Sequence, residues 1–250
     1  MPIRRHVLLA PALLGAGHAR AAGEVQLAVA SNFAQPMQAL AAAFHAAGGH
    51  RVRVSIGSTG QFHAQSLAGA PFDALLAADE QTPARLIASG HAVAGSAFTY
   101  AVGRLVLWSA RAGWVDADGA VRASPGLQRL EIANPRVAPY GAAAMQVLQS
   151  RGLVDALRAR LVTAESIAQA YQFVASGNAD AGFVALAQLL VPGREAGGSS
   201  WRVPASLHAP IRQGAVLLRR GQHKPAALAL LDWLRGADAR ERMRAFGYET

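Results

Sequence analysis

Four short turns in this sequence place hydroxyl, amide or glycine residues directly before a predicted helix. The turns are Ser31-Asn32, Ser58-Thr59-Gly60, Tyr140-Gly141 and Ser166-Ile167. The first N–H groups of a helix have no intrahelical partner, and the helix dipole adds partial positive charge at that end. Because no arginine or lysine lies within these turns, the chemistry that they share is the binding of a small oxyanion by neutral hydrogen-bond donors.

Each turn taken alone is also explained as an ordinary helix cap, since serine, threonine and asparagine are preferred N-cap residues. The combination favours a ligand, because two turns fall in each half of the chain and a closed cleft would bring all four together. Neutral donors suit a fully ionised oxyanion. A protonated phosphate would need an acceptor, and no carboxylate lies within the four turns.

Apolar patterning supplies the elements that must position these turns. It predicts strands at 25–30, 52–56, 73–78, 98–108, 129–133, 181–184 and 211–218. It predicts helices at 33–46, 61–67, 83–89, 142–149, 168–176, 185–190, 225–235 and 238–246, with loops at 110–128 and 192–204.

Strands that alternate with helices imply parallel sheets covered by helices. The long strands at 98–108 and 211–218 interrupt this alternation, and they predict a two-strand hinge between two lobes. We therefore expect an α/β fold in which each lobe is a mostly parallel sheet flanked by helices. Lobe I would comprise 22–100 and 209–250, and lobe II 101–208, with a ligand in the cleft between them.

The first 21 residues are typical of a signal peptide. Arg4 and Arg5 precede an apolar stretch at 7–17 that is too short to span a bilayer, and Ala19-Arg20-Ala21 fits a cleavage site. We expect export to the periplasm by the Sec route, with the arginine pair leaving the twin-arginine route open. The chain has no cysteine, so no lipid anchor, thiolate metal site or cysteine nucleophile is expected.

The formal charge of +9 comes from scattered arginines rather than from a basic block interleaved with aromatic residues. We expect no nucleic-acid partner, no membrane-embedded segment in the mature chain and no cofactor. A secreted serine hydrolase built on Ser58, His63 and Asp73 is the alternative from another class. It has little support, because the sequence contains no nucleophile elbow, phosphate loop or metal cluster.

In six segments the sequence resembles the periplasmic molybdate-binding proteins that serve ABC-type importers. The segments are AVASNF from Ala28, SIGSTGQFHAQ from Ser55, GAPFDALLAADE from Gly69, FTYAVGRLVLWS from Phe98, ANPRVAPYG from Ala133 and ASGNADAGFVALAQ from Ala175. Their order and combination are specific, whereas each segment alone is weak evidence.

This resemblance implies the type II periplasmic binding protein fold, capture of molybdate or tungstate, delivery to an ABC permease, and a monomer. It also implies an oxyanion site on the turns named above. The implied donors are Ser31, Asn32, Thr59, Tyr140 and Ile167, the last through its backbone N–H, with Ser58, Gly60, Gly141 and Ser166 as secondary candidates.

The tyrosine in the third turn departs from the pattern of many family members. They have a small residue where Tyr140 stands, and a tyrosine on the strand end that here reads Phe183-Val184-Ala185. A branch with the Pro-Tyr-Gly form suggests that Tyr140 supplies the hydroxyl from the other side of the ligand. A half-buried cap on the following helix is the alternative role, and sulfate or chromate is the alternative ligand.

Overall fold

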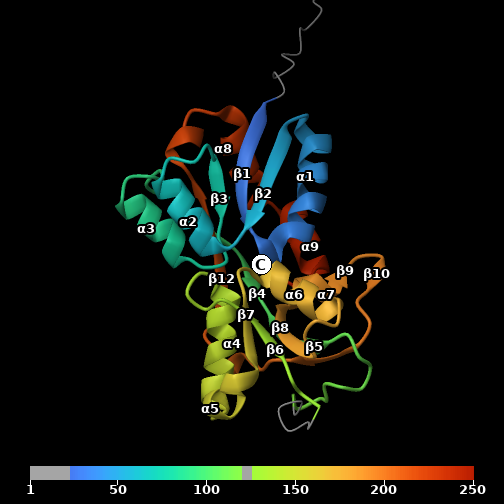
Figure 1. Ribbon diagram of the computed structural model, residues 1–250. Coiled ribbons are helices and arrows are strands. Elements are labelled where there is room, and N and C mark those ends of the chain that lie inside the picture. The colour runs from blue at the N-terminus through green and yellow to red at the C-terminus, as the bar shows by residue number, and fades with distance from the viewer. Residues whose placement is uncertain (1–22, 120–125) are drawn as a thin grey trace, which may run out of the picture.

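The structure is a computed structural model that describes residues 23–119 and 126–250. The predicted signal peptide, 1–21, lies outside the described residues. Two five-stranded sheets, one above the other in Figure 1, form the centres of two lobes. We call the lobe with strand order β2-β1-β3-β12-β4 the first lobe, and the lobe with order β11-β5-β8-β6-β7 the second lobe.

In the first lobe, β1, β2 and β3 are parallel, and β12 runs antiparallel between β3 and β4. The strands are β1 Glu24–Ala30, β2 Arg51–Gly57, β3 Ala74–Leu76, β4 Phe98–Gly103 and β12 Ile211–Leu217. The helices that flank them are α1 Ala34–Gly48, α2 Thr59–Leu67, α3 Gln81–Ala88, α8 Pro225–Leu234 and α9 Ala237–Ala245. One core cluster joins the sheet to α1, α8 and α9, and another joins it to α2 and α3 (Figure 1).

In the second lobe, β6, β7 and β8 are parallel, and β5 is antiparallel to both β8 and β11. The strands are β5 Leu105–Ser109, β6 Leu130–Ala133, β7 Leu161–Ala164, β8 Ala181–Ala185 and β11 Ser199–Arg202. The helices are α4 Pro139–Ser150, α5 Val154–Leu157, α6 Ile167–Ala175 and α7 Leu186–Leu189, and a short hairpin pairs β9 Leu190–Val191 with β10 Arg194–Glu195. Each lobe is thus a mostly parallel sheet flanked by helices, as predicted.

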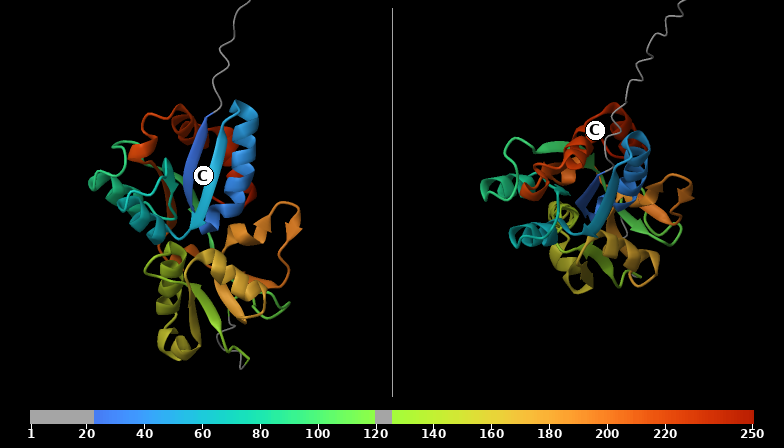
Figure 2. Two further views of the ribbon diagram at one scale, coloured as in Figure 1. Left: turned by 45° about the horizontal axis from the view of Figure 1, so that its top comes forward. Right: turned by 90° about the horizontal axis from the view of Figure 1, so that it is seen from above.

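The strand predicted at 98–108 is two strands in two different sheets. Gly103 ends β4 in the first lobe, Leu105 begins β5 in the second, and the exposed Arg104 lies between them. The chain returns to the first lobe at Ile211, which is paired with Gly103. The segment predicted as one strand therefore crosses from one lobe to the other, and the left view of Figure 2 shows the two lobes one above the other.

In the second lobe one predicted loop is wrong, and one strand was missed. The segment expected to be a loop at 192–204 contains β10 and β11, and β7 at Leu161–Ala164 was not predicted. Both β11 and β7 are edge strands, and each forms because a distant strand offers backbone hydrogen bonds; Trp201 of β11, for example, is opposite Leu107 of β5. Such short strands carry too little periodicity of their own to be recognised.

A buried carboxylate anchors β3 in the first lobe. Asp73, fully buried just before the strand, accepts a hydrogen bond from the backbone N–H of Gln26 at 2.8 Å. Its two oxygens also pair with Arg220 at 3.2 Å and with Lys224, the only lysine of the chain, at 2.9 Å. Burying a carboxylate is unfavourable unless it is paired and hydrogen-bonded, and these contacts give Asp73 a structural role.

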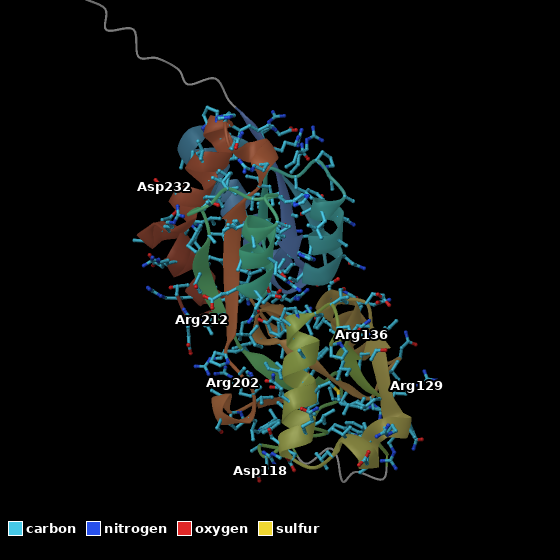
Figure 3. The ribbon with its side chains drawn as sticks, turned by 90° about the vertical axis from the view of Figure 1, so that its left-hand side faces the viewer. Asp118, Arg129, Arg136, Arg202, Arg212 and Asp232 are labelled. Carbon is cyan, nitrogen blue, oxygen red and sulfur yellow. The ribbon has the colours of Figure 1, made fainter. Side chains whose placement is uncertain are left out.

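The charged side chains are spread over the outside of both lobes. Figure 3 shows Arg212 near the junction of the lobes, Arg202 and Arg129 on opposite sides of the second lobe, and Asp118 toward its far end. Among the residues that the structure describes, no helix has the length and apolar character needed to cross a membrane.

Candidate functional site

The four turns identified from the sequence converge between the two lobes. Each follows the carboxyl end of a strand and leads into a helix: β1 into α1, β2 into α2, β6 into α4 and β7 into α6. A small cavity lies where they meet. Its lining includes the five primary candidates Ser31, Asn32, Thr59, Tyr140 and Ile167, together with Ser58.

Three hydroxyl groups of the first lobe line the cavity, and the oxygen of each already accepts a hydrogen bond from a backbone N–H group. The Thr59 hydroxyl oxygen accepts the N–H of Ala78 at 2.9 Å, and the Ser58 hydroxyl oxygen accepts the N–H of Gln61 at 3.4 Å. The Ser31 hydroxyl oxygen accepts a hydrogen bond at 3.4 Å from the N–H of Ala168, which lies across the cleft in the second lobe. Within residues 23–119 and 126–250, none of the three hydroxyl protons has an acceptor, so each is available to a ligand.

The Asn32 side chain is occupied within the protein. Its Nδ2 donates to Gln213 Oε1 at 2.9 Å and to the Tyr248 hydroxyl at 3.0 Å. Its backbone N–H lies in the 3-10 turn Ser31–Phe33 that precedes α1, where N–H groups have no intrahelical partner. Asn32 can therefore offer a ligand its backbone N–H while its side chain holds the turn.

From the second lobe, Tyr140 and Ile167 reach the cavity at the first residues of α4 and α6. The Tyr140 hydroxyl accepts a hydrogen bond from Gln213 Nε2 at 3.1 Å. Burial, reinforced by the neighbouring Tyr248 and Tyr100, holds the pKa of Tyr140 well above its ordinary value of 10.0, so its phenol is neutral. The sequence alternative of a half-buried cap underestimates the burial of this side chain, which is 1% exposed.

The secondary candidates other than Ser58 lie outside the lining of this cavity. Gly60 N–H donates to the Val137 carbonyl across the cleft at 2.9 Å. Gly141 packs so closely on β6 that a Cβ would collide with the Ala133 carbonyl. The Ser166 hydroxyl caps α6 by accepting the Gln169 N–H at 3.3 Å.

The electrostatics of the cavity come from backbone dipoles rather than from charged side chains. No lining residue carries a formal charge, while the N-terminal ends of α2, α4 and α6 face it directly and α1 does so through its 3-10 turn. Helix N-termini favour negative charge. The arrangement can bind a small anion through about half a dozen neutral donors without neutralising it by a salt bridge.

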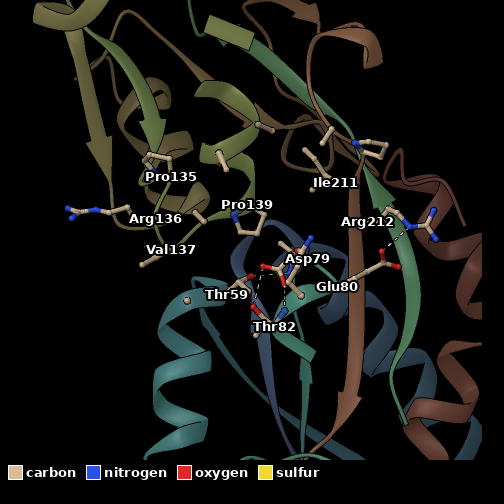
Figure 4. A pocket seen from close by; sticks show the side chains of 18 of the residues that line it. Thr59, Asp79, Glu80, Thr82, Pro135, Arg136, Val137, Pro139, Ile211 and Arg212 are labelled. Atoms are coloured by element: carbon tan, nitrogen blue, oxygen red, sulfur yellow. Dashed lines mark hydrogen bonds and ion pairs between the residues drawn. The ribbon is translucent and has the colours of Figure 1, made fainter. Parts of the chain in front are cut away.

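A larger groove opens beside the cavity and shares Thr59, Ala78 and Pro139 with it. Figure 4 shows this groove, with the Asp79 carboxylate directed toward Thr82 and Glu80 paired with Arg212. The Asp79 oxygens accept the Thr82 N–H at 2.7 Å and its hydroxyl at 3.2 Å, so Asp79 satisfies a backbone N–H group in the first turn of α3.

Sequence reasoning missed the contribution of Ala78 to the lining. Ala78 follows β3, and its N–H fixes the orientation of the Thr59 hydroxyl. The signal was present, because β3 is a third parallel strand whose carboxyl end must meet the same edge of the sheet. An alanine carries no polar side chain, so attention to hydroxyl and amide residues alone passes over it.

The alternative hydrolase trio is not assembled. Asp73 is paired with Arg220 and Lys224, and the Ser58 hydroxyl caps α2. No hydrogen bond joins His63 to either residue in the described part of the chain; burial, followed by the nearby Arg85, lowers the pKa of His63. No group of three or more histidine, cysteine or acidic residues is placed to hold a metal ion within the same residues.

Two lobes that enclose a cavity of neutral donors at their junction define an extracellular solute-binding protein. Over residues 25–249 the sequence matches the family of bacterial extracellular solute-binding proteins, and the chain belongs to that family. It is 54% identical to the molybdate-binding protein ModA of Azotobacter vinelandii over 238 residues, which cover 94% of each chain. It is 48% identical to ModA of Rhodobacter capsulatus over 238 residues, 95% of this chain and 93% of the relative.

The solved structure of the Azotobacter vinelandii periplasmic molybdate-binding protein has the same fold. It superimposes with a TM-score of 0.88 at 42% sequence identity and covers 90% of this chain and 99% of the other. Identity at this level over nearly the full length shows that the chain belongs to the ModA family. The type II binding-protein fold implied by the sequence is confirmed.

Proposed function

We propose that this protein captures molybdate or tungstate between its two lobes in the periplasm and delivers the oxyanion to an ABC permease. The observation that carries the proposal is the uncharged cavity, which is lined by three hydroxyl groups and by residues at the N-termini of helices from both lobes. The names of the relatives at 54% and 48% identity support molybdate as the ligand. The protein acts as a monomer that binds without catalysis, and it reaches the periplasm by signal-peptide export.

In this proposal the five primary residues surround one tetrahedral dianion. Ser31 and Thr59 donate their hydroxyl protons, and Asn32, Tyr140 and Ile167 donate backbone N–H groups. Ser58 is the additional hydroxyl donor. Hydrogen bonds to a charged group are about twice as strong as neutral ones, so several neutral donors replace a cationic side chain.

Closure of the lobes completes the site. We propose that residues 22–100 and 209–250 move as one lobe and 101–208 as the other, about the crossings near Arg104 and Ile211. Two cross-lobe hydrogen bonds, from Gly60 N–H to the Val137 carbonyl at 2.9 Å and from Ala168 N–H to the Ser31 hydroxyl at 3.4 Å, support a closed arrangement. Ligand binding would stabilise this closed form by contacting both lobes at once.

Calorimetric titration of the mature protein with molybdate, tungstate, sulfate and phosphate tests the proposed ligand. We expect saturable binding of molybdate and tungstate near neutral pH and much weaker binding of phosphate. The monohydrogen form of phosphate must donate its proton, and the cavity lining contains no carboxylate to accept it. Absence of heat and of thermal stabilisation with molybdate would refute the proposal, and tighter binding of sulfate would assign the site to that anion.

Loss of a single hydroxyl should weaken molybdate binding without unfolding the protein. Thr59→Ala and Ser31→Ala each remove one hydrogen bond to a charged ligand, worth about 1.5–3 kcal/mol, so affinity should fall about tenfold to a hundredfold. Thr59→Ser, which keeps the hydroxyl, should bind nearly as well as the parent. Calorimetry measures the affinities.

Ser66→Ala is the matched control for these variants, because Ser66 is buried on the same helix as Thr59 and its hydroxyl has no hydrogen-bond partner in the described chain. It should leave the affinity for molybdate unchanged. If Thr59→Ala and Ser31→Ala also bind like the parent, the anion site lies elsewhere.

A further inference from the structure

Behind the anion cavity lies a buried cluster of five polar side chains from both lobes. Its members are Asn32, Tyr100, Tyr140, Gln213 and Tyr248. Gln213 is fully buried, and the other four are at most 4% exposed. The proposed function assigns ligand contacts to Asn32 and Tyr140 only, so the other three side chains have no assigned role.

Gln213 is the centre of this cluster. Its Oε1 accepts hydrogen bonds from Asn32 Nδ2 at 2.9 Å and from the Tyr100 hydroxyl at 2.8 Å. Its Nε2 donates to the Tyr140 hydroxyl at 3.1 Å. The opposite orientation of the amide would set two N–H donors against each other at Asn32, so the surrounding groups determine which way Gln213 points.

Tyr248 forms a side-chain hydrogen bond with Tyr140 and fixes the Asn32 turn by two others. The Tyr248 hydroxyl accepts from Asn32 Nδ2 at 3.0 Å and donates to the Asn32 carbonyl at 3.1 Å. Tyr248 is itself held at the hinge, because its neighbour Glu249 exchanges two backbone hydrogen bonds with Val102 of β4. The end of the chain, which Figure 1 shows at the junction of the lobes, thus contributes to the geometry of the cavity.

Gln213 occupies a position where the two lobes meet. It lies on β12 opposite Ala101, next to a register irregularity between Gln213 and Gly214. A Cβ at Gly103 would lie 2.6 Å from Gln213 Nε2 and would collide with the Tyr140 hydroxyl, so a glycine is needed there for the two groups to meet. The Gln213 amide on a hinge strand therefore connects the Asn32 turn of the first lobe to the Tyr140 turn of the second, beside a second connection through Tyr248.

We propose that Gln213 is a positioning residue for oxyanion binding. By fixing the Asn32 and Tyr140 side chains, it sets the relative position of two anion-facing turns before the ligand arrives. Donors that are already in place lose less freedom on binding, so the affinity depends on side chains that never touch the ligand. This inference rests on the proposed function, because it assigns the role of Gln213 to the same cavity.

Gln213→Met tests the proposal, since methionine has a similar length and no hydrogen-bonding amide. We expect the affinity for molybdate to fall about tenfold or more, by analogy with the loss of about 10- to 100-fold in metal affinity when a hydrogen-bond partner of a metal-binding side chain is removed. Tyr100→Phe is the matched control, because it removes a hydroxyl from Gln213 without breaking the connection to either turn. It should change the affinity less than threefold.

The double variant Gln213→Met/Tyr140→Phe separates positioning from a merely structural role. In the single variant the Tyr140 hydroxyl is left buried without its Gln213 donor, and phenylalanine removes that group. The ligand-free double variant should regain part of the lost resistance to urea, while its affinity for molybdate stays about tenfold below that of the parent. Affinity that recovers together with stability would overturn the positioning role.

Three further outcomes have distinct meanings. Folded Gln213→Met that binds like the parent, while Thr59→Ala binds more weakly, would overturn the inference and leave the proposed function intact. A parent protein that does not bind molybdate would overturn both. A double variant that binds at least tenfold more weakly than Gln213→Met would show a direct contact of the Tyr140 hydroxyl with the anion, which contradicts action of Gln213 through that hydroxyl.

Discussion

Replacing Gly60 by alanine should weaken molybdate binding by about 30-fold to several hundred-fold while leaving the ligand-free protein as stable as the parent or more so. In the closed arrangement a Cβ at position 60 would lie 2.8 Å from the Val137 Cβ and 2.9 Å from its Cα. The backbone of the second lobe would have to move away, and the hydrogen bond from Gly60 N–H to the Val137 carbonyl would lengthen.

The size of this effect follows from two contributions. Overpacking costs about 1–3 kcal/mol, and loss of a hydrogen bond costs about 0.5–1.5 kcal/mol. Together they oppose closure by about 2–4 kcal/mol, which corresponds to the loss of affinity stated above. When the lobes are apart the contact with Val137 is absent, and alanine favours helix α2 over glycine by about 0.5–1 kcal/mol.

Calorimetry with molybdate, together with small-angle scattering of the free and ligand-bound protein, measures the effect of Gly60→Ala. Compaction on adding molybdate should be reduced in the variant. Gly48→Ala is the matched control, because Gly48 is also helical and a Cβ there meets nothing closer than 3.5 Å. If Gly60→Ala binds as tightly as Gly48→Ala, the contact with Val137 does not limit closure.

The sequence predicted the positions of the anion-facing turns better than the roles of the groups within them. Ser31 and Thr59 follow strands with strong apolar patterning, so the ends of those strands and the start of each helix were recognisable. The contact of Gly60 with Val137 joins the two lobes, and the two residues are 77 positions apart in the chain. No local pattern reports such a contact.

The same limit explains Tyr140. The sequence indicated a tyrosine at a helix start, and the resemblance suggested a hydroxyl directed at the ligand. In the structure that hydroxyl accepts a hydrogen bond from Gln213, which lies 73 residues further along the chain. Edge strand β11 was missed for a related reason, because its pairing with β5 comes from tertiary structure rather than from its own residues.

The sequence also did not predict the burial of an acidic side chain in the second lobe. Glu131 lies in the apolar strand β6 between Leu130 and Ile132 and is 1% exposed. Its Oε1 has no hydrogen-bond partner within the described residues. A Cβ at Gly182 of β8, opposite Glu131, would lie 3.0 Å from the Glu131 Cβ, so the glycine leaves room for the acid.

Burial raises the pKa of Glu131 from 4.5 to about 7. Below pH 4.5 the acid is protonated in both the folded and the unfolded chain and does not affect the pH dependence of stability. Between pH 4.5 and 7 the folded chain retains a proton that the unfolded chain has released, so stability falls as pH rises. Above pH 7 the loss is complete and, at 1.36 kcal/mol per pKa unit, amounts to about 3 kcal/mol.

Glu131→Gln should therefore raise the free energy of unfolding relative to the parent, by an amount that grows by about 2–3 kcal/mol between pH 5 and pH 8. Urea unfolding of the ligand-free protein at intervals across this range measures the difference. Glu241→Gln, which makes the same substitution on an exposed position of α9, controls for the loss of one negative charge and should show no such growth. A constant difference for Glu131→Gln would mean that the carboxylate of Glu131 is already ionised at pH 5 in the folded protein.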